Sequence, residues 1–272
     1  MRNSKTNELV LTGLFTAIII IMAFTPLGYI PLVVINATII HIPVILGSLF
    51  CGPKKGAFLG FVFGFTSCLK ATIVGGTLSS FVFSPVLAAS LVGTSGIFKS
   101  LFIAFVPRIL VGVIPYFVYI GIKKVLASEK KNLWGIVLNV LMSAFLAFGV
   151  YAFLGKMVES LSQAAALGIG IVVGVVVFVV VEAVFIRKST QVIPFVYAGV
   201  AGAMTNTLLV MGSIFVLYKD AYAEAIGVAG NAVLGVITGV ISFNGVIEAI
   251  VAAIIVYLVG LVLNTIKPIA AK

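Results

Sequence analysis

The sequence predicts an all-α polytopic membrane protein with about eight transmembrane helices. Hydrophobic residues make up 62% of the 272 positions, whereas charged residues make up only 9%. A water-soluble domain of this length needs a more charged surface than this composition can supply. Long apolar stretches, of the length that spans the hydrocarbon core of a bilayer, recur along the chain. We therefore expect residues 1–272 to form a single integral membrane domain.

Turn residues and charges divide the chain into eight apolar segments. In order, the expected helices are 9–24, 37–51, 56–70, 100–121, 133–154, 164–186, 192–218 and 231–264. The segments 37–51 and 56–70 are short for a complete crossing. The last segment is long and is interrupted by Asn244-Gly245. It either crosses once or contains a re-entrant or surface stretch that leads into a final crossing.

Basic residues are distributed unequally between the two sides that this topology defines. If the N-terminus is cytoplasmic, the inner connections contain twelve of the seventeen Lys and Arg residues: Arg2, Lys5, Lys54, Lys55, Lys123, Lys124, Lys130, Lys131, Arg187, Lys188, Lys267 and Lys272. The outer connections contain Lys70, Lys99, Lys156 and Lys219. This bias is typical of the positive-inside rule and predicts a plasma-membrane protein with both termini in the cytoplasm. Anionic headgroups of the bilayer account for the net charge of +10 without a nucleic-acid partner.

Motifs for catalysis and for ATP hydrolysis are missing from the sequence. No GxxxxGK(S/T) phosphate-binding loop occurs, and a single His with two Cys does not supply an ordinary zinc site. We expect neither a metal nor an organic cofactor. The sequence therefore favours binding or transport over an enzymatic activity.

Charged side chains inside the apolar segments are candidate site residues, because lipid penalises them. Arg108 is expected one or two helical turns below the outer face, where its guanidinium is suited to hold a carboxylate. It could instead form an internal ion pair with Glu182 or Glu248, and Glu248 could serve only to neutralise it. Lys70, at the end of the third span, either reaches the outer headgroups or gives an anion a second contact.

Two uncharged polar side chains have competing interpretations of the same kind. His41, about one turn into the second span, either forms a hydrogen bond between helices or contacts a ligand. Asn206 lies in the run Thr205-Asn206-Thr207 and has no reason to be polar unless it is paired. It either joins two helices or binds a ligand.

Small residues four positions apart allow helix backbones to approach closely in lipid. Gly56, Gly60 and Gly64 form such a stripe on the third span, and we expect it to pack inside the protein. Gly13 and Ala17 form a shorter stripe on the first span. This second stripe could pack internally or could dock a separate membrane subunit.

Six short motifs occur in order along the chain: NATIIHIPVILG at 36–47, CGPKKGAFLGFVFG at 51–64, SSFVFSP at 79–85, FVPR at 105–108, TNT at 205–207 and NGVIEAIV at 244–251. Together they resemble the substrate-binding S components of energy-coupling factor (ECF) vitamin transporters. The resemblance covers about residues 9–121 and 192–264 and is greatest for the pantothenate-type branch. Riboflavin, folate and pyridoxine remain as alternative vitamins. Because this family usually has six spans, the resemblance implies that 133–186 is a pair of inserted helices.

The resemblance implies a division of labour between several proteins. An S component binds its vitamin from the outside and joins a coupling transmembrane subunit that carries two cytoplasmic ATPase subunits. Gly13 and Ala17 on the first span then become the expected docking residues for the coupling subunit. The expected substrate contacts are Arg108, Lys70, His41, Asn36, Asn206, Asn244 and Glu248.

Two other classes of function remain open at this stage. A self-sufficient secondary transporter of a small anionic metabolite would use Glu182, Glu248 or Arg108 as coupling groups. An intramembrane enzyme or assembly factor is the third possibility, and the missing catalytic residues argue against it.

Overall fold

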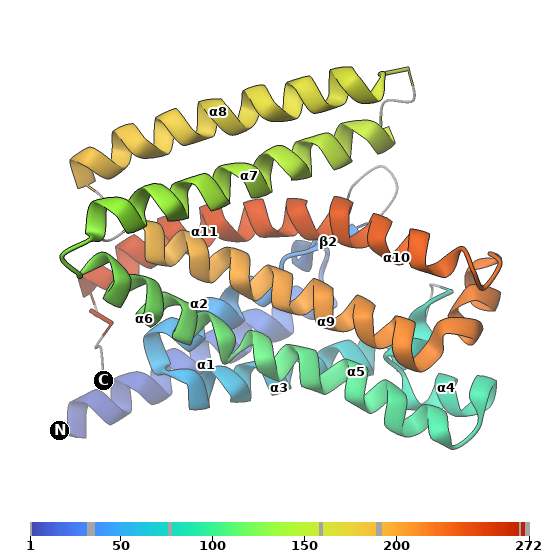
Figure 1. The fold of residues 1–272 in the computed structure, drawn as a ribbon. Coiled ribbons are helices and arrows are strands. Elements are labelled where there is room, and N and C mark those ends of the chain that lie inside the picture. The colour runs from blue at the N-terminus through green and yellow to red at the C-terminus, as the bar shows by residue number, and fades with distance from the viewer. Residues whose placement is uncertain are drawn as a thin grey trace.

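Long helices that run back and forth between two ends form most of the protein (Figure 1). The structure, a computed structural model, describes residues 2–31, 36–75, 78–157, 160–188, 192–266 and 268–269. In chain order the elements are α1 (Arg2–Phe24), η1 (Pro26–Gly28), β1 (Tyr29–Pro31), β2 (Asn36–Thr38), α2 (His41–Cys51), α3 (Pro53–Ile73), η2 (Ser80–Val82), α4 (Pro85–Val92), α5 (Ser95–Val111), α6 (Ile114–Leu126), α7 (Lys131–Met157), α8 (Gln163–Lys188), α9 (Val192–Ile226), α10 (Val233–Val240), the π-helical turn η3 (Ile241–Gly245) and α11 (Val246–Ile266).

The predicted class, an all-α polytopic membrane protein, is confirmed. Seven helical segments of the described residues are long and apolar enough to cross a bilayer: Thr6–Phe24, Pro53–Ile73, Ser95–Leu126, Lys131–Gly155, Gln163–Val180, Val192–Ile226 and Val233–Ile266. The remaining predicted span, 37–51, corresponds to α2, which has 11 residues. A helix of that length reaches only about 16 Å, too short to cross the hydrocarbon core alone.

A small β-hairpin takes the place of the first part of the predicted span 37–51. Strands β1 and β2 pair antiparallel, with Tyr29 opposite Thr38. The predicted helix start at residue 37 was therefore wrong. Figure 1 shows β2 between the ends of the long helices, not beyond them. Non-helical backbone at such a depth is tolerated where its polar groups find partners inside the protein. Here the pairing of the strands and a 3.0 Å hydrogen bond from Ile39 N to Gly28 O supply such partners.

The last predicted segment is one continuous helical run that is long and apolar enough to cross once. α10, η3 and α11 follow one another without a break from Val233 to Ile266, which favours a single crossing over the re-entrant alternative for 231–245. The π-helical turn Ile241–Gly245 is a local expansion of the helix. Such turns are rare and occur often at functional sites.

The predicted span 100–121 is broken into α5 and α6. α5 ends at Val111, α6 begins at Ile114, and Pro115 occupies the first turn of α6. Proline cannot donate to the carbonyl four residues earlier and collides with it, so a continuous helix is broken before Pro115. The carbonyl of Gly112 at this break accepts a 2.6 Å hydrogen bond from Ser48 Oγ on α2.

Basic residues gather at one end of the bundle. The first turns of α1, α3 and α7 and the last turns of α6, α8 and α11 all lie at this end (Figure 1). Ten of the twelve basic residues assigned to the inner connections lie at these helix ends or in the α6–α7 connection. Lys267 and Lys272 lie outside the described residues. The predicted charge asymmetry therefore corresponds to two distinct ends of the folded chain.

α3 and α5 lie in close backbone contact along the glycine stripe. A Cβ added to Gly56, Gly60 or Gly64 would collide with the backbone carbonyl of Gly112, Arg108 or Ala104 on the neighbouring segment. The prediction that this stripe packs inside the protein is confirmed. Gly13 on α1 is different, since a Cβ there would meet no atom of the described chain within 4 Å.

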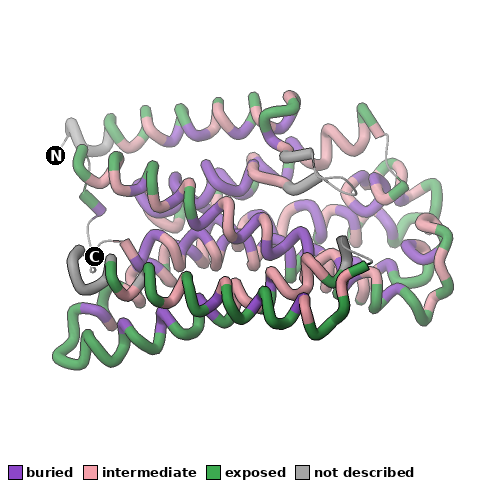
Figure 2. The backbone as a smooth tube through the Cα atoms, turned by 90° about the horizontal axis from the view of Figure 1, so that it is seen from above, coloured by how far each residue is buried: buried purple, intermediate pink, exposed green. Residues whose placement is uncertain are grey.

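α7 and α8 form a hairpin at the edge of the bundle, with α7 between α8 and the other helices (Figure 1). Asn139 Nδ2 on α7 donates 2.9 Å hydrogen bonds to Phe178 O and to Glu182 Oε2 on α8. Exposed valines cover much of α8, as expected for a surface that meets lipid, and Figure 2 shows exposed residues along outward faces and buried ones between helices. That residues 133–186 are an insertion into a six-helix core stays a prediction.

The close contact between α3 and α5 can be tested by filling the space that Gly60 leaves. We expect Gly60→Leu to destabilise the protein by about 1–3 kcal/mol, because the larger side chain must push α3 away from the Arg108 carbonyl. Thermal unfolding of the detergent-solubilised protein measures the change. Gly13→Leu is the matched control, and an equal loss of stability in both variants would contradict the asymmetry between the two glycines.

Candidate functional site

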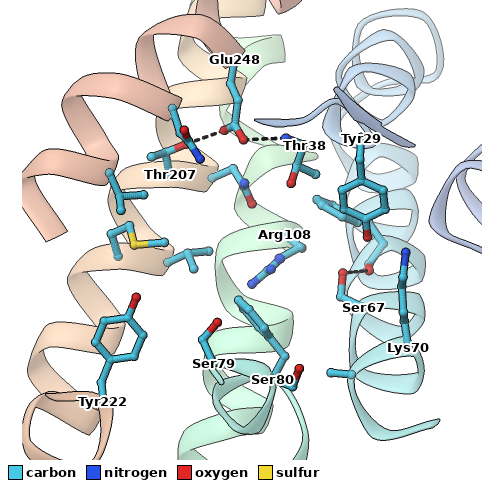
Figure 3. Close-up of a pocket in the computed structure, with 18 of the residues that line it drawn as sticks. Tyr29, Thr38, Ser67, Lys70, Ser79, Ser80, Arg108, Thr207, Tyr222 and Glu248 are labelled. Atoms are coloured by element: carbon cyan, nitrogen blue, oxygen red, sulfur yellow. Dashed lines mark hydrogen bonds between the residues drawn. The ribbon is translucent and has the colours of Figure 1, made fainter. Parts of the chain in front are cut away.

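A cavity of about 560 Å³ lies among α3, α5, α9, η3, α11 and the β-hairpin. Segment 78–84, which contains η2, contributes to its wall as well (Figure 3). The lining combines aromatic and aliphatic side chains with a small set of polar groups, as in most small-molecule sites. The lining includes Tyr29, Thr38, Phe63, Lys70, Phe83, Arg108, Asn206, Thr207, Asn244 and Glu248.

Arg108 lies near the middle of this cavity (Figure 3) and is only 6% exposed. It is deeper than the one or two turns expected, because α5 begins at Ser95 and Arg108 is about 20 Å from that end of the helix. Its Nη1 donates to Ile103 O at 2.5 Å. Its guanidinium carbon lies 4.6 Å from the centre of the Phe83 ring and 5.5 Å from that of Phe63. The guanidinium is thus held by aromatic faces and a carbonyl, and its buried Nε has no hydrogen-bond partner in the described structure.

Glu248 occupies another corner of the cavity (Figure 3) and is 5% exposed. Its Oε1 accepts a 2.8 Å hydrogen bond from the backbone N–H of Thr38 on β2. Its Oε2 accepts one of 2.8 Å from Thr207 Oγ1 on α9. Glu248 therefore connects three segments that are far apart in the sequence. Among the described residues no ion pair joins Arg108 to a carboxylate, so the alternative of an internal ion pair with Glu182 or Glu248 is wrong for this structure.

Two buried amides contribute acceptors without partners. Asn206 on α9 is 8% exposed and Asn244 in η3 is 5% exposed, and both line the cavity. The Oδ1 atom of each has no hydrogen-bond partner in the part of the chain that the structure describes. A buried polar atom without a partner costs free energy, so it points to a ligand, ion or water that completes it. The π-helical turn places Asn244 at the cavity.

Lys70 lies in the last turn of α3 and also lines the cavity. Its Nζ donates a 2.9 Å hydrogen bond to Ala23 O in the last turn of α1 and lies 4.0 Å from the centre of the Tyr29 ring. This arrangement ties the lysine to α1 and to the hairpin. Its ammonium therefore gives the lining a second positive charge in addition to that of Arg108.

Five of the seven predicted substrate contacts line the cavity, His41 does not, and the side chain of Asn36 lies outside the described residues. Lys70, Arg108, Asn206, Asn244 and Glu248 are brought together from four elements, α3, α5, α9 and the η3–α11 run.

His41 begins α2, is completely buried and does not line the cavity, and neither of its ring nitrogens has a partner among the described residues. Asn36 is the first residue of β2, and its side chain lies outside the described part. The predicted docking residues Gly13 and Ala17 are exposed on α1, away from the cavity lining.

Several lining residues were missed by reasoning from the sequence. Thr38 contributes a backbone N–H, which no side-chain pattern reveals. Phe83 lies in the run SSFVFSP and contacts Arg108, but an aromatic residue in an apolar chain carries no distinctive signal. Thr207 lies beside Asn206 and could have been found, since both residues interrupt an apolar helix with polar groups.

The cavity offers donors and acceptors for a small polar ligand with a negative charge. Two cations and two unpartnered amide oxygens share a small space with aromatic walls. Glu182, a proposed coupling group for a secondary transporter, bonds Asn139 in the α7–α8 hairpin instead.

The family model for the substrate-specific component of ECF transporters matches residues 7–186. The pantothenic acid transporter PanT of Lactococcus lactis subsp. cremoris is 42% identical over 161 residues, which cover 55% of this chain and 78% of the relative. The pantothenate transporter PanT of Leuconostoc mesenteroides subsp. mesenteroides is 37% identical over 119 residues, 42% of this chain and 51% of the relative.

The unpartnered amide of Asn206 leads to a prediction about stability. We expect Asn206→Leu to stabilise the ligand-free protein by about 1–2 kcal/mol, because a buried oxygen without a partner is replaced by an apolar group of similar shape. Asn139→Leu is the matched control and should destabilise, because the Asn139 amide bonds Phe178 O and Glu182. Thermal unfolding without ligand distinguishes them. Destabilisation by Asn206→Leu would mean that this amide has an internal partner.

Proposed function

This chain belongs to the substrate-specific components of ECF transporters, and we propose that it binds pantothenate and delivers it for uptake across the plasma membrane. Both relatives named above are pantothenate transporters. Pantothenate carries a carboxylate, an amide and two hydroxyl groups. The observation that carries the proposal is that one buried cavity contains the unpartnered Nε of Arg108 and the unpartnered Oδ1 atoms of Asn206 and Asn244.

Arg108 is the proposed anchor for the carboxylate of the vitamin. A guanidinium binds a carboxylate through parallel hydrogen bonds, and such charge-assisted bonds are among the strongest in proteins. The contact with Phe83 and the bond to Ile103 O hold the Arg108 group in place before the ligand arrives, which lowers the entropic cost of binding. Lys70 adds a second positive charge, and the amides of Asn206 and Asn244 accept hydrogen bonds from the N–H and hydroxyl groups.

The partners proposed for this chain are a coupling transmembrane subunit and two cytoplasmic ATPase subunits. The family to which the chain belongs is named for such a transporter, and no ATP-binding loop is found in the sequence. We assign the end of the bundle that carries the basic helix ends to the cytoplasm, since cytoplasmic connections are enriched in Lys and Arg. The exposed stripe of Gly13 and Ala17 on α1 is the proposed contact with the coupling subunit.

Titration of the purified protein with pantothenate tests the role of Arg108. We expect the wild-type protein to bind pantothenate without ATP or partners, in preference to riboflavin, folate and pyridoxine. Arg108→Ala should weaken binding by about 2–5 kcal/mol, because a desolvated partner of the carboxylate is removed. Isothermal titration calorimetry in detergent measures both.

Lys219→Ala removes a cation that is exposed on α9 and does not line the cavity, so its affinity should be unchanged. Equal affinities for the wild type and a folded Arg108→Ala variant would refute the anchor. No binding of any of the four vitamins by folded wild-type protein would refute the assignment of the substrate.

Gly13→Leu tests the proposed docking surface. We expect it to impair vitamin uptake in cells while leaving pantothenate binding by the isolated chain intact, because a Cβ at this position meets no atom of the described chain within 4 Å and a larger side chain there obstructs a partner helix. Uptake of radiolabelled pantothenate and calorimetry of the purified variant measure the two properties. Normal uptake by the Gly13→Leu variant would mean that this face of α1 does not contact the coupling subunit.

A further inference from the structure

The cavity contains charges of both signs that do not pair with each other. Of its lining residues, Lys70 and Arg108 are basic and Glu248 is acidic. In a low-dielectric environment such opposite charges normally pair directly, because each is costly alone. Among the described residues the recorded ion pair joins Lys55 to Glu8, far along α3 from the cavity. The separation of Glu248 from the two cations therefore needs a structural cause.

Both charged groups are held in place by other partners. Hydrogen bonds from Thr38 N and Thr207 Oγ1 occupy one lone pair on each carboxylate oxygen of Glu248. Arg108 is held by Ile103 O and by the ring of Phe83. Figure 3 shows Glu248 at the α11 side of the cavity and Arg108 nearer its middle. The two groups thus define an acidic end and a basic region within one site.

This arrangement imposes two requirements on a ligand. Its negative charge belongs beside Arg108 and Lys70, and hydrogen-bond donors belong beside Glu248, whose oxygens can each accept a further bond. With all three side chains ionised, Lys70, Arg108 and Glu248 give the lining two positive charges and one negative charge. One negative charge on the ligand therefore brings the site to neutrality, whereas a second negative charge near Glu248 would meet a like charge in a buried place.

We propose that Glu248 is a specificity-determining residue that orients the ligand and restricts the site to organic anions with a single negative charge. The proposal rests on the proposed function, since it takes pantothenate as the ligand. The carboxylate of pantothenate then lies at Arg108, and its hydroxyl end lies at Glu248. Glu248 acts here as an acceptor for hydroxyl groups and as a barrier to an anionic group at the same end.

The test compares two substituents on the terminal hydroxyl of pantothenate. A phosphoryl group adds negative charge there, and an acetyl group adds neutral bulk. We expect the wild-type protein to bind the phosphorylated ligand at least about tenfold more weakly than the acetylated one. In Glu248→Gln the affinities for the two ligands should become similar, because the amide oxygen still accepts a hydrogen bond from Thr38 N while the negative charge is gone. Calorimetric titration of both ligands and of pantothenate supplies the affinities.

Thr207→Val is the matched control, because it removes one hydrogen bond of Glu248 and keeps its charge. The difference between the two ligands should persist in this variant. The proposal is overturned if the wild type loses equal affinity for both substituents, because shape would then decide, or if the difference survives in Glu248→Gln. If Glu248→Gln does not fold, the affinities of the wild-type protein for the two ligands still show whether charge or shape weakens binding. Failure of the wild type to bind pantothenate would instead defeat the proposed function.

Discussion

Two helices in a membrane approach closely only where small side chains leave room for their backbones. α3 and α5 meet in this way along Gly56, Gly60 and Gly64, against the carbonyls of Gly112, Arg108 and Ala104. The rest of the site depends on this contact. It sets the distance between the two helices, and it brings Phe63 on α3 into contact with the guanidinium of Arg108 on α5. A bulkier α3 would move the proposed anchor of the ligand away from the other walls of the cavity.

Irregular backbone is concentrated around the cavity. The β-hairpin, the π-helical turn η3 and the segment 78–84 all contribute lining residues. Each departs from the continuous helices that form the outer parts of the bundle. Such departures are tolerated at membrane depth only where the backbone is enclosed by protein or lines a cavity. Their function here is geometric, because they direct polar groups from four or more segments toward one point.

Polar groups without partners connect stability to binding. Arg108, Asn206 and Asn244 are buried and each has an atom without a hydrogen-bond partner in the described structure. The ligand-free protein therefore carries a free-energy cost that a complementary ligand can relieve. Glu248 is the contrasting case, because both of its oxygens are already bonded and it braces β2 against α9 and α11. The site thus combines side chains whose polar atoms have no partner without a ligand and one side chain, Glu248, that joins the segments around the cavity.

Composition and pattern determined the class of this protein, because spanning a bilayer requires long apolar helices and an unequal distribution of charge. They also singled out Lys70, Arg108, Asn206 and Glu248 as candidate site residues, since polar groups stand out in an apolar chain and lipid penalises them wherever they lie. Asn244 became a candidate through the resemblance to the S components.

Only the tertiary structure decided which of these groups pair. The hairpin in place of a helix start, the burial of His41 outside the cavity and the separation of Arg108 from Glu248 all depend on contacts between segments far apart in the sequence. No local pattern encodes such contacts, because a residue's neighbours in space follow from the packing of the whole bundle.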